Sequence, residues 1–121
     1  IGKFGMIQYE LADDYARLEA LRSLVYRAAW MMDEKYKRKR FTPLEVSKII
    51  STVKLLGPPL AFKIFYDAMV WLGAWGYTKE CPLEMGMRGI MSYVVGAEGA
   101  LNIQRVVLVR ELLGSEYIDY K

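Results

Sequence analysis

The 121-residue sequence predicts an all-α fold, an up-down four-helix bundle that forms one domain over residues 1–121. Three observations lead to this fold class. Apolar residues recur at steps of three and four along several long segments, as on one face of a helix. Proline and glycine signals for helix starts and stops separate these segments. The connections between them are short, which is typical of antiparallel bundles, and no periodic strand pattern or internal repeat occurs.

The first helix is predicted over residues 5–35. Its apolar seam repeats every seven residues, which favours packing against neighbouring helices at a shallow angle. The seam consists of Ile7, Leu11, Leu18, Leu21, Val25, Ala28 and Met32. Asp14 is the one polar residue on it. This carboxylate is either a buried functional group or a charged side chain that lies near an open end or pairs with a Lys or Arg of a neighbouring helix.

A dense basic run with one aromatic, residues 35–40, follows the first helix. Such a run is compatible with binding of nucleic acid, or of a ligand or partner that carries phosphate. Solvated charges are also expected between two helices, and the sequence offers no element that would read a DNA groove. We therefore expect a solvated connection and no nucleic-acid partner.

The second helix is predicted over residues 43–72. Thr42 serves as the N-cap, Pro43 occupies the first helical position and Glu45 closes a capping box. The segment Gly-Pro-Pro at residues 57–59 removes two backbone donors, so a kink or a break is predicted there, with the second half of the helix restarting at Pro58.

A glycine-punctuated turn over residues 73–81 leads to two shorter helices, over residues 82–95 and 98–113. Gly114 is well placed to stop the last helix.

Composition limits the chemistry of the chain. The sequence contains no His and a single cysteine, Cys81, so His-based triads, imidazole metal sites, common structural zinc patterns and an intrachain disulfide are excluded. Catalysis requires a carboxylate, Lys, Tyr, backbone donors or a cofactor. The formal net charge of +3 is no argument for a nucleic-acid partner.

The longest nearly uncharged run, residues 68–78, is too short to cross a bilayer. We expect a soluble protein without a membrane span, located in the cytoplasm or, in a eukaryote, in the mitochondrial matrix. The chain begins with Ile1 and shows no signal-peptide pattern. This suggests a fragment or a processed product.

Two segments carry a specific residue order. The first reads Leu-Gly-Ala-Trp-Gly-Tyr-Thr-Lys-Glu-Cys-Pro-Leu-Glu over residues 72–84 and is followed by Arg88, and the second reads Glu-Gly-Ala-Leu-Asn-Ile-Gln-Arg over residues 98–105. Together they resemble the C-terminal domain of the acyl-CoA dehydrogenases, which carry Ile-Leu-Gly-Gly-x-Gly-Tyr, Thr-Lys-Glu-x-Pro-x-Glu, an Arg and Glu-Gly-Thr-x-x-Ile-Gln-Arg. The resemblance extends from Phe4 to Leu113.

The resemblance implies a base at Glu98. In this family a flavin accepts a hydride from the β-carbon of an acyl-CoA thioester while a carboxylate removes the α-proton. The thioester carbonyl must then be polarised by preorganised donors, among them the backbone N–H of this Glu, in a dry site. The plain structural alternative is that Glu98 only offsets the macrodipole at the start of the last helix.

The resemblance also implies contacts with FAD. Gly73, Ala74, Trp75 and Gly76 correspond to a turn that approaches the FAD of a neighbouring subunit, although such a turn is otherwise a plain helix cap and loop. Gly99, Ala100 and Asn102 belong to the second FAD-contacting segment. The sequence departs from the family pattern at Val70 (usually Gln), at Ala74 (Gly) and at Ala100 (Thr), and one extra residue separates Arg88 from Glu98.

The chain is therefore expected to be the C-terminal domain of a FAD-dependent acyl-CoA dehydrogenase, inactive alone. The implied partners are an acyl-CoA substrate, the missing N-terminal and middle domains or a partner polypeptide, and further copies in a homo-oligomer. The electron acceptor is either an electron-transferring flavoprotein or, as in the related oxidases, oxygen. The alternative is a non-catalytic helical-bundle assembly or flavin-binding subunit, which the departures at Val70, Ala74 and Ala100 would fit.

Overall fold

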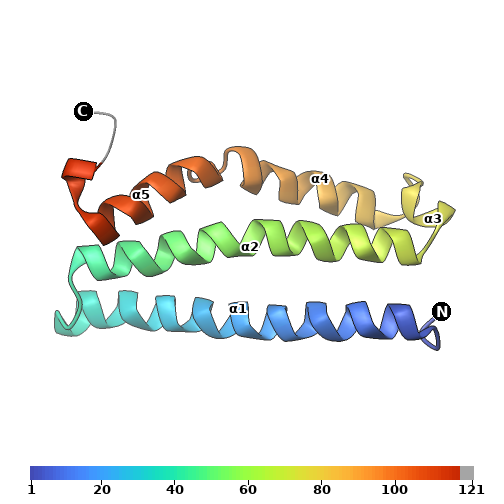
Figure 1. The fold of residues 1–121 in the computed structure, drawn as a ribbon, viewed down its shortest axis with the longest axis horizontal. Coiled ribbons are helices and arrows are strands. Elements are labelled where there is room, and N and C mark those ends of the chain that lie inside the picture. Colours follow the sequence, from blue (N-terminus) through green and yellow to red (C-terminus); the bar gives the residue numbers. More distant parts are fainter. Residues whose placement is uncertain (118–121) are drawn as a thin grey trace.

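The computed structural model describes residues 1–117, which form helices joined by short connections (Figure 1). The elements are α1 (Gly5–Arg38), α2 (Pro43–Trp71), α3 (Ala74–Tyr77), α4 (Pro82–Val95), α5 (Leu101–Leu113) and a 3-10 turn, η1 (Ser115–Tyr117). Within the described residues there is no strand, and the all-α fold is confirmed. The helices do not alternate as in the predicted up-down four-helix bundle, because α5 continues in the direction of α4 along the same side of α2. α2 lies in the centre, with α1 along one side and α4 and α5 end to end along the other.

Local signals set most of the helix ends. The capping box of α2 is present, since the Glu45 amide donates to the Thr42 hydroxyl at 3.2 Å and the Thr42 amide donates to the Glu45 carboxylate at 2.8 Å. Gly114, with φ of 110°, ends α5 as predicted. α1 continues to Arg38 instead of residue 35, because basic side chains are favourable in the last helical turn.

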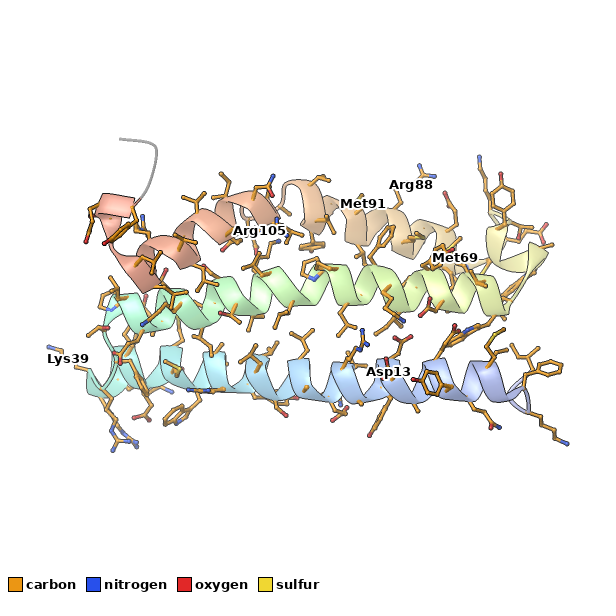
Figure 2. All side chains as sticks on the ribbon, in the orientation of Figure 1. Asp13, Lys39, Met69, Arg88, Met91 and Arg105 are labelled. Atoms are coloured by element: carbon orange, nitrogen blue, oxygen red, sulfur yellow. The ribbon has the colours of Figure 1, made fainter. Side chains whose placement is uncertain are left out.

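The basic run therefore belongs largely to the end of α1. Arg38 and Arg40 both pair with the buried Glu34, at 2.9 and 3.2 Å. Lys39 adopts the left-handed conformation, with φ of 55°, and its amide donates to the Glu34 carbonyl. Figure 2 shows the Lys39 side chain at the α1–α2 connection, extended away from the helices. These residues close α1 and are partly neutralised by its own carboxylates.

The predicted seam of α1 is partly wrong. The buried residues of α1 are Asp14, Ala28, Met31 and Glu34, whereas four predicted seam residues, Leu11, Leu18, Val25 and Met32, are exposed. A straight helix has 3.6 residues per turn and rotates by about 20° per heptad relative to a strict seven-residue repeat. Over the 34 residues of α1, the face toward α2 drifts off the predicted positions.

The break predicted at residues 57–59 is absent, because α2 runs without interruption through Pro58 and Pro59. The two prolines leave the carbonyls of Lys54 and Leu55 without their usual amide donors. Gly57 reduces the steric cost, since it has no Cβ to collide with the Pro58 ring. α1 packs along α2 on one side and α4 and α5 on the other, so packing holds both halves of α2 in line.

α2 is also the one helix of residues 1–117 that is long and apolar enough to cross a membrane, with a mean hydropathy of 1.2 over 18 residues. It contains no long uncharged run, because Lys54 and Lys63 interrupt its apolar sequence, and it was therefore not predicted. Length and composition are weak evidence for a span. The lysines of α2 instead bond to its neighbours in the fold, Lys63 to α1 and Lys54 to the loop between α4 and α5.

Candidate active site

Glu98 lies in the loop between α4 and α5, and not at the start of the last helix as predicted. Its φ is 57° and that of Gly99 is 99°, so both residues have a left-handed backbone that ends any helical path. α5 begins at Leu101, with Ala100 as its N-cap. Glu98 is therefore outside the first turn of α5, and the explanation of this carboxylate as a simple macrodipole partner loses its basis.

Two side chains hold this loop from different elements. The Lys54 ammonium of α2 donates to the Ala97 carbonyl oxygen at 2.6 Å. The Gln104 amide of α5 donates to the Glu98 carbonyl oxygen at 3.2 Å. The loop closes on itself as well, since the Gly99 amide donates to the Gly96 carbonyl at 2.9 Å. Its left-handed conformation is thus fixed by contacts on both sides of Glu98.

Glu98 lines a cavity of about 310 Å³ between α2 and the α4–α5 loop. The cavity is lined by Glu98, Lys54, Tyr93 and Gln104 together with the less polar Ile50, Val53, Gly57 and Pro58. Glu98 is exposed, and no cation within residues 1–117 forms an ion pair with its carboxylate. An unpaired carboxylate beside a partly apolar cavity can accept a proton from a ligand that fills the cavity.

Gly99, Ala100 and Asn102 lie directly beside Glu98. A Cβ on Gly99 would stand 2.7 Å from the Gln104 side-chain nitrogen, so only glycine fits this position without displacing the loop anchor. Ala100 provides no side-chain cap, which leaves the first amides of α5 without the hydroxyl acceptor that Thr would supply. Asn102 is exposed, and its carbonyl oxygen accepts a hydrogen bond from Arg105 at 2.7 Å.

The turn of Gly73 to Gly76 lies at the far end of α2. Gly73, with φ of 61°, precedes the single-turn α3 and is exposed, as are Ala74 and Trp75. Gly76 is buried against the backbone of α2, and a Cβ at this position would collide with the Met69 carbonyl oxygen. Figure 2 labels Met69 near the C-terminal end of α2. This close approach of α3 to α2 requires glycine at residue 76 and was not predicted from the sequence.

The predicted site residues thus form two groups and not one. Glu98, Gly99, Ala100 and Asn102 lie beside the middle of α2, whereas Gly73 to Gly76 lie beyond its C-terminal end. From Gly57 to Trp71 the helix rises by roughly 21 Å, at 1.5 Å per residue.

The turn is suitable for a flat ligand approached by the backbone. A Cβ on Gly73 would meet no heavy atom within 4 Å, so the main chain is open to contact there. The Trp75 ring is 49% exposed and offers a stacking surface. Val70 is also exposed but cannot form the hydrogen bonds of a Gln. The turn therefore offers open backbone at Gly73 and an aromatic surface at Trp75 to a flat ligand, and Val70 offers it no hydrogen bond.

Sequence reasoning missed Lys54, Tyr93 and Gln104 as neighbours of Glu98. The Lys54 ammonium lies 5.1 Å from the centre of the Tyr93 ring, a cation–π contact that joins α2 to α4. Lys54 lies between Val53 and Leu55, and a single charged residue between apolar neighbours indicates a specific polar contact in the fold. Gln104 belongs to the segment that carries the family resemblance, but no contact with Glu98 was predicted for it.

Asp14 belongs to a separate charged cluster between α1 and α2. Lys63 donates to Asp14 at 2.8 Å and also pairs with Asp67. The two carboxylates raise the pKa of Lys63 from 10.5 to about 12. Of the two readings of Asp14, pairing with a cation of a neighbouring helix is confirmed. One Asp14 oxygen is buried without a hydrogen bond, so the cluster is only partly satisfied.

Comparison with known proteins gives concordant matches. Residues 1–113 match the family described as "Acyl-CoA dehydrogenase, C-terminal domain". The cyclohexane-1-carbonyl-CoA dehydrogenase of Geobacter metallireducens is 38% identical over 108 residues, 89% of this chain and 26% of that protein. The mitochondrial short-chain specific acyl-CoA dehydrogenase of Bos taurus is 38% identical over 113 residues, 93% of this chain and 25% of that protein.

A solved structure described as "Electron transferring flavoprotein of Acidaminococcus fermentans: Towards a mechanism of flavin-based electron bifurcation" has a similar fold. The TM-score is 0.80 at 31% sequence identity, and the match covers 93% of this chain and 27% of that one. The chain thus spans about a quarter of the length of these relatives.

Proposed function

The chain belongs to the acyl-CoA dehydrogenase family, of which it is the C-terminal domain, and from this premise we propose that Glu98 is the base that removes the α-proton of an acyl-CoA thioester. One observation carries the proposal. Glu98 is held in a left-handed loop conformation and lines a cavity, and its carboxylate forms no ion pair within residues 1–117. A strained position held by several contacts is typical of a functional residue.

Each part of the loop has a task in this proposal. The Glu98 carboxylate takes the α-proton, and the C–H electron pair forms the α,β double bond as a hydride leaves the β-carbon. FAD, when bound, supplies the hydride acceptor. The Glu98 backbone N–H donates to the thioester carbonyl and stabilises the negative charge that develops there. Since Glu98 is exposed in this chain, the acyl group must exclude water from the carboxylate to make it an effective base.

FAD binding by this chain is divided between its two ends. We propose that Gly99, Ala100 and Asn102 contact the FAD used by Glu98, and that the turn of Gly73 to Gly76 contacts the FAD of a neighbouring subunit. The separation of the two groups along α2 supports a homo-oligomer. Further domains or a partner polypeptide complete the site, and an electron-transferring flavoprotein is the proposed acceptor. The cytoplasm or the mitochondrial matrix is the proposed location.

The test is Glu98→Gln in the full-length protein or the reconstituted complex. Gln keeps the size of the side chain but cannot accept the proton, so kcat should fall by about 10²–10⁴-fold with KM little changed. Glu80→Gln, an exposed residue in the loop before α4, is the matched control and should retain activity. Equal turnover of the two variants would favour the alternative, a non-catalytic assembly or flavin-binding subunit.

A further inference from the structure

We propose that Lys54 is a positioning residue that orients and polarises the peptide group between Ala97 and Glu98, so that the Glu98 N–H is aimed at the thioester carbonyl. The inference rests on the proposed function of the Glu98 loop and adds a residue from another helix to it. Its basis is the hydrogen bond of 2.6 Å from the Lys54 ammonium to the Ala97 carbonyl oxygen.

The geometry of the peptide bond makes this hydrogen bond informative. The Ala97 C=O and the Glu98 N–H belong to one planar trans peptide group and point in opposite directions. A cation that holds the oxygen therefore also fixes the direction of the N–H. The Glu98 carbonyl, in the next peptide group, is held by Gln104. Both peptide groups that flank the Glu98 Cα are fixed in this way.

The charge of Lys54 has a second effect. A hydrogen bond from an ammonium is roughly twice as strong as one between neutral groups. It draws electron density toward the Ala97 oxygen and makes the N–H of the same peptide a better donor, as in cooperative hydrogen-bond chains. The Glu98 N–H thus donates a stronger hydrogen bond to a carbonyl oxygen that gains negative charge during the reaction.

The surroundings of Lys54 keep it in this role. Its side chain is half-buried and rests over the Tyr93 ring of α4, at 5.1 Å. Within residues 1–117 no carboxylate forms an ion pair with Lys54, whereas Lys63, nine residues along the same helix, pairs with two. Lys54 is therefore free to bond to the backbone, and it does not neutralise the Glu98 carboxylate by direct pairing.

The test compares Lys54→Met, Lys54→Arg and the control Lys48→Met in the full-length holoenzyme. Met keeps the length of the stem but removes the charge and the donors, whereas Arg keeps both. Lys48 lies on α2 and forms no ion pair within residues 1–117, whereas Lys54 is the α2 lysine that bonds to the Glu98 loop. For Lys54→Met we expect kcat to fall by about 10- to 100-fold with a small change in KM, since an oxyanion donor is weakened but not lost. Lys54→Arg should recover most of this loss.

The direct readout is the infrared or Raman stretch of the thioester carbonyl in a bound acyl-CoA product. Polarisation by the Glu98 N–H lowers this frequency, and Lys54→Met should return it part of the way toward its value in water. A merely structural lysine would change the melting temperature and leave the frequency alone. If Lys54→Met does not fold, Lys54→Arg and Tyr93→Leu, which removes only the aromatic support, give intermediate shifts under the proposal.

The two proposals fail in different ways. If Glu98→Gln abolishes turnover while Lys54→Met matches Lys48→Met in kcat and carbonyl frequency, the role of Lys54 is wrong and that of Glu98 stands. If Glu98→Gln retains turnover, the proposed function itself is wrong.

Discussion

Gly99 shows how strongly a single residue constrains the candidate site. It has φ of 99°, and a Cβ there would stand 2.7 Å from the Gln104 nitrogen that holds the Glu98 carbonyl. Gly99→Ala should therefore cost about 1–3 kcal/mol of unfolding free energy, from backbone strain and the displaced anchor. It should also lower turnover of the full-length enzyme. Urea unfolding followed by circular dichroism gives the first quantity and a turnover assay the second.

Gly89→Ala is the matched control for this prediction. Gly89 lies inside α4, and a Cβ there would meet nothing within 4 Å. Alanine in a helix interior is favoured over glycine by roughly 0.5–1 kcal/mol, so this variant should be more stable than the parent. If both alanine variants shift stability in the same direction, the argument from φ and space at Gly99 is wrong.

The sequence predicted residues of the site better than it predicted their geometry. Glu98 was predicted as the base because its position relative to Ile103, Gln104 and Arg105 is specific, and the order of residues can be read directly from the sequence. The left-handed backbone conformation of Glu98 was not predicted, since non-glycine residues rarely have a positive φ and no local sequence rule favours a positive φ at a Glu. The contact of Lys54 with Ala97 depends on how α2 aligns with a loop 43 residues away, and neither local propensity nor periodicity carries that information.

At the scale of elements, the interface between α1 and α2 depends on the cluster of Lys63 with Asp14 and Asp67. Lys63→Met would leave the buried Asp14 carboxylate without its cation and should cost about 1–3 kcal/mol. This lies below the usual penalty for a broken buried ion pair, because the Lys63 side chain is 40% exposed and water reaches it. Lys48→Met is the control on the same helix, and adding Asp14→Leu to Lys63→Met should restore part of the stability.

The same cluster predicts a pH dependence. Because folding raises the pKa of Lys63 from 10.5 to about 12, its stabilising contribution is complete below pH 10.5 and is lost as the pH rises toward 12. Thermal unfolding of the parent measured across this window should show that loss, and Lys63→Met should lack it. Identical alkaline profiles for the two proteins would contradict the role given to the ion pairs.

Element boundaries were predictable where a local signal sets them and not where packing does. Thr42, Pro43 and Glu45 start α2 through hydrogen bonds within one turn, and Gly114 ends α5 through its own φ. The continuity of α2 through Pro58 and Pro59 is different. Local chemistry favours a break there, and only the helices that pack on both halves of α2 keep it straight.

The molecule as a whole has more surface than its mass requires. A compact monomer of 14.0 kDa exposes roughly 6,700 Å², whereas this chain exposes 8839 Å². Within residues 1–117 the buried apolar residues are few, namely Ala28, Met31, Val46 and Cys81. Large side chains such as Leu18, Trp30 and Leu112 are exposed, as expected for a surface that other domains or subunits cover.

Residues 1–121 produced alone should therefore self-associate. Sedimentation velocity should show a mass that rises with concentration, and a dye that binds apolar surface should fluoresce. The full-length protein should show a fixed oligomer and little dye binding. A fragment that stays monomeric at its highest soluble concentration, without dye binding, would contradict this account of the exposed surface.

The end-to-end arrangement of α4 and α5 has a consequence for how such a site diverges between relatives. Each of the two helices packs on its own stretch of α2, and the Glu98 loop is the joint between them. An insertion or deletion in that joint would move the carboxylate without disturbing either packed helix. Substrate range can thus evolve here through loop length, while the buried helical surfaces keep their sequence.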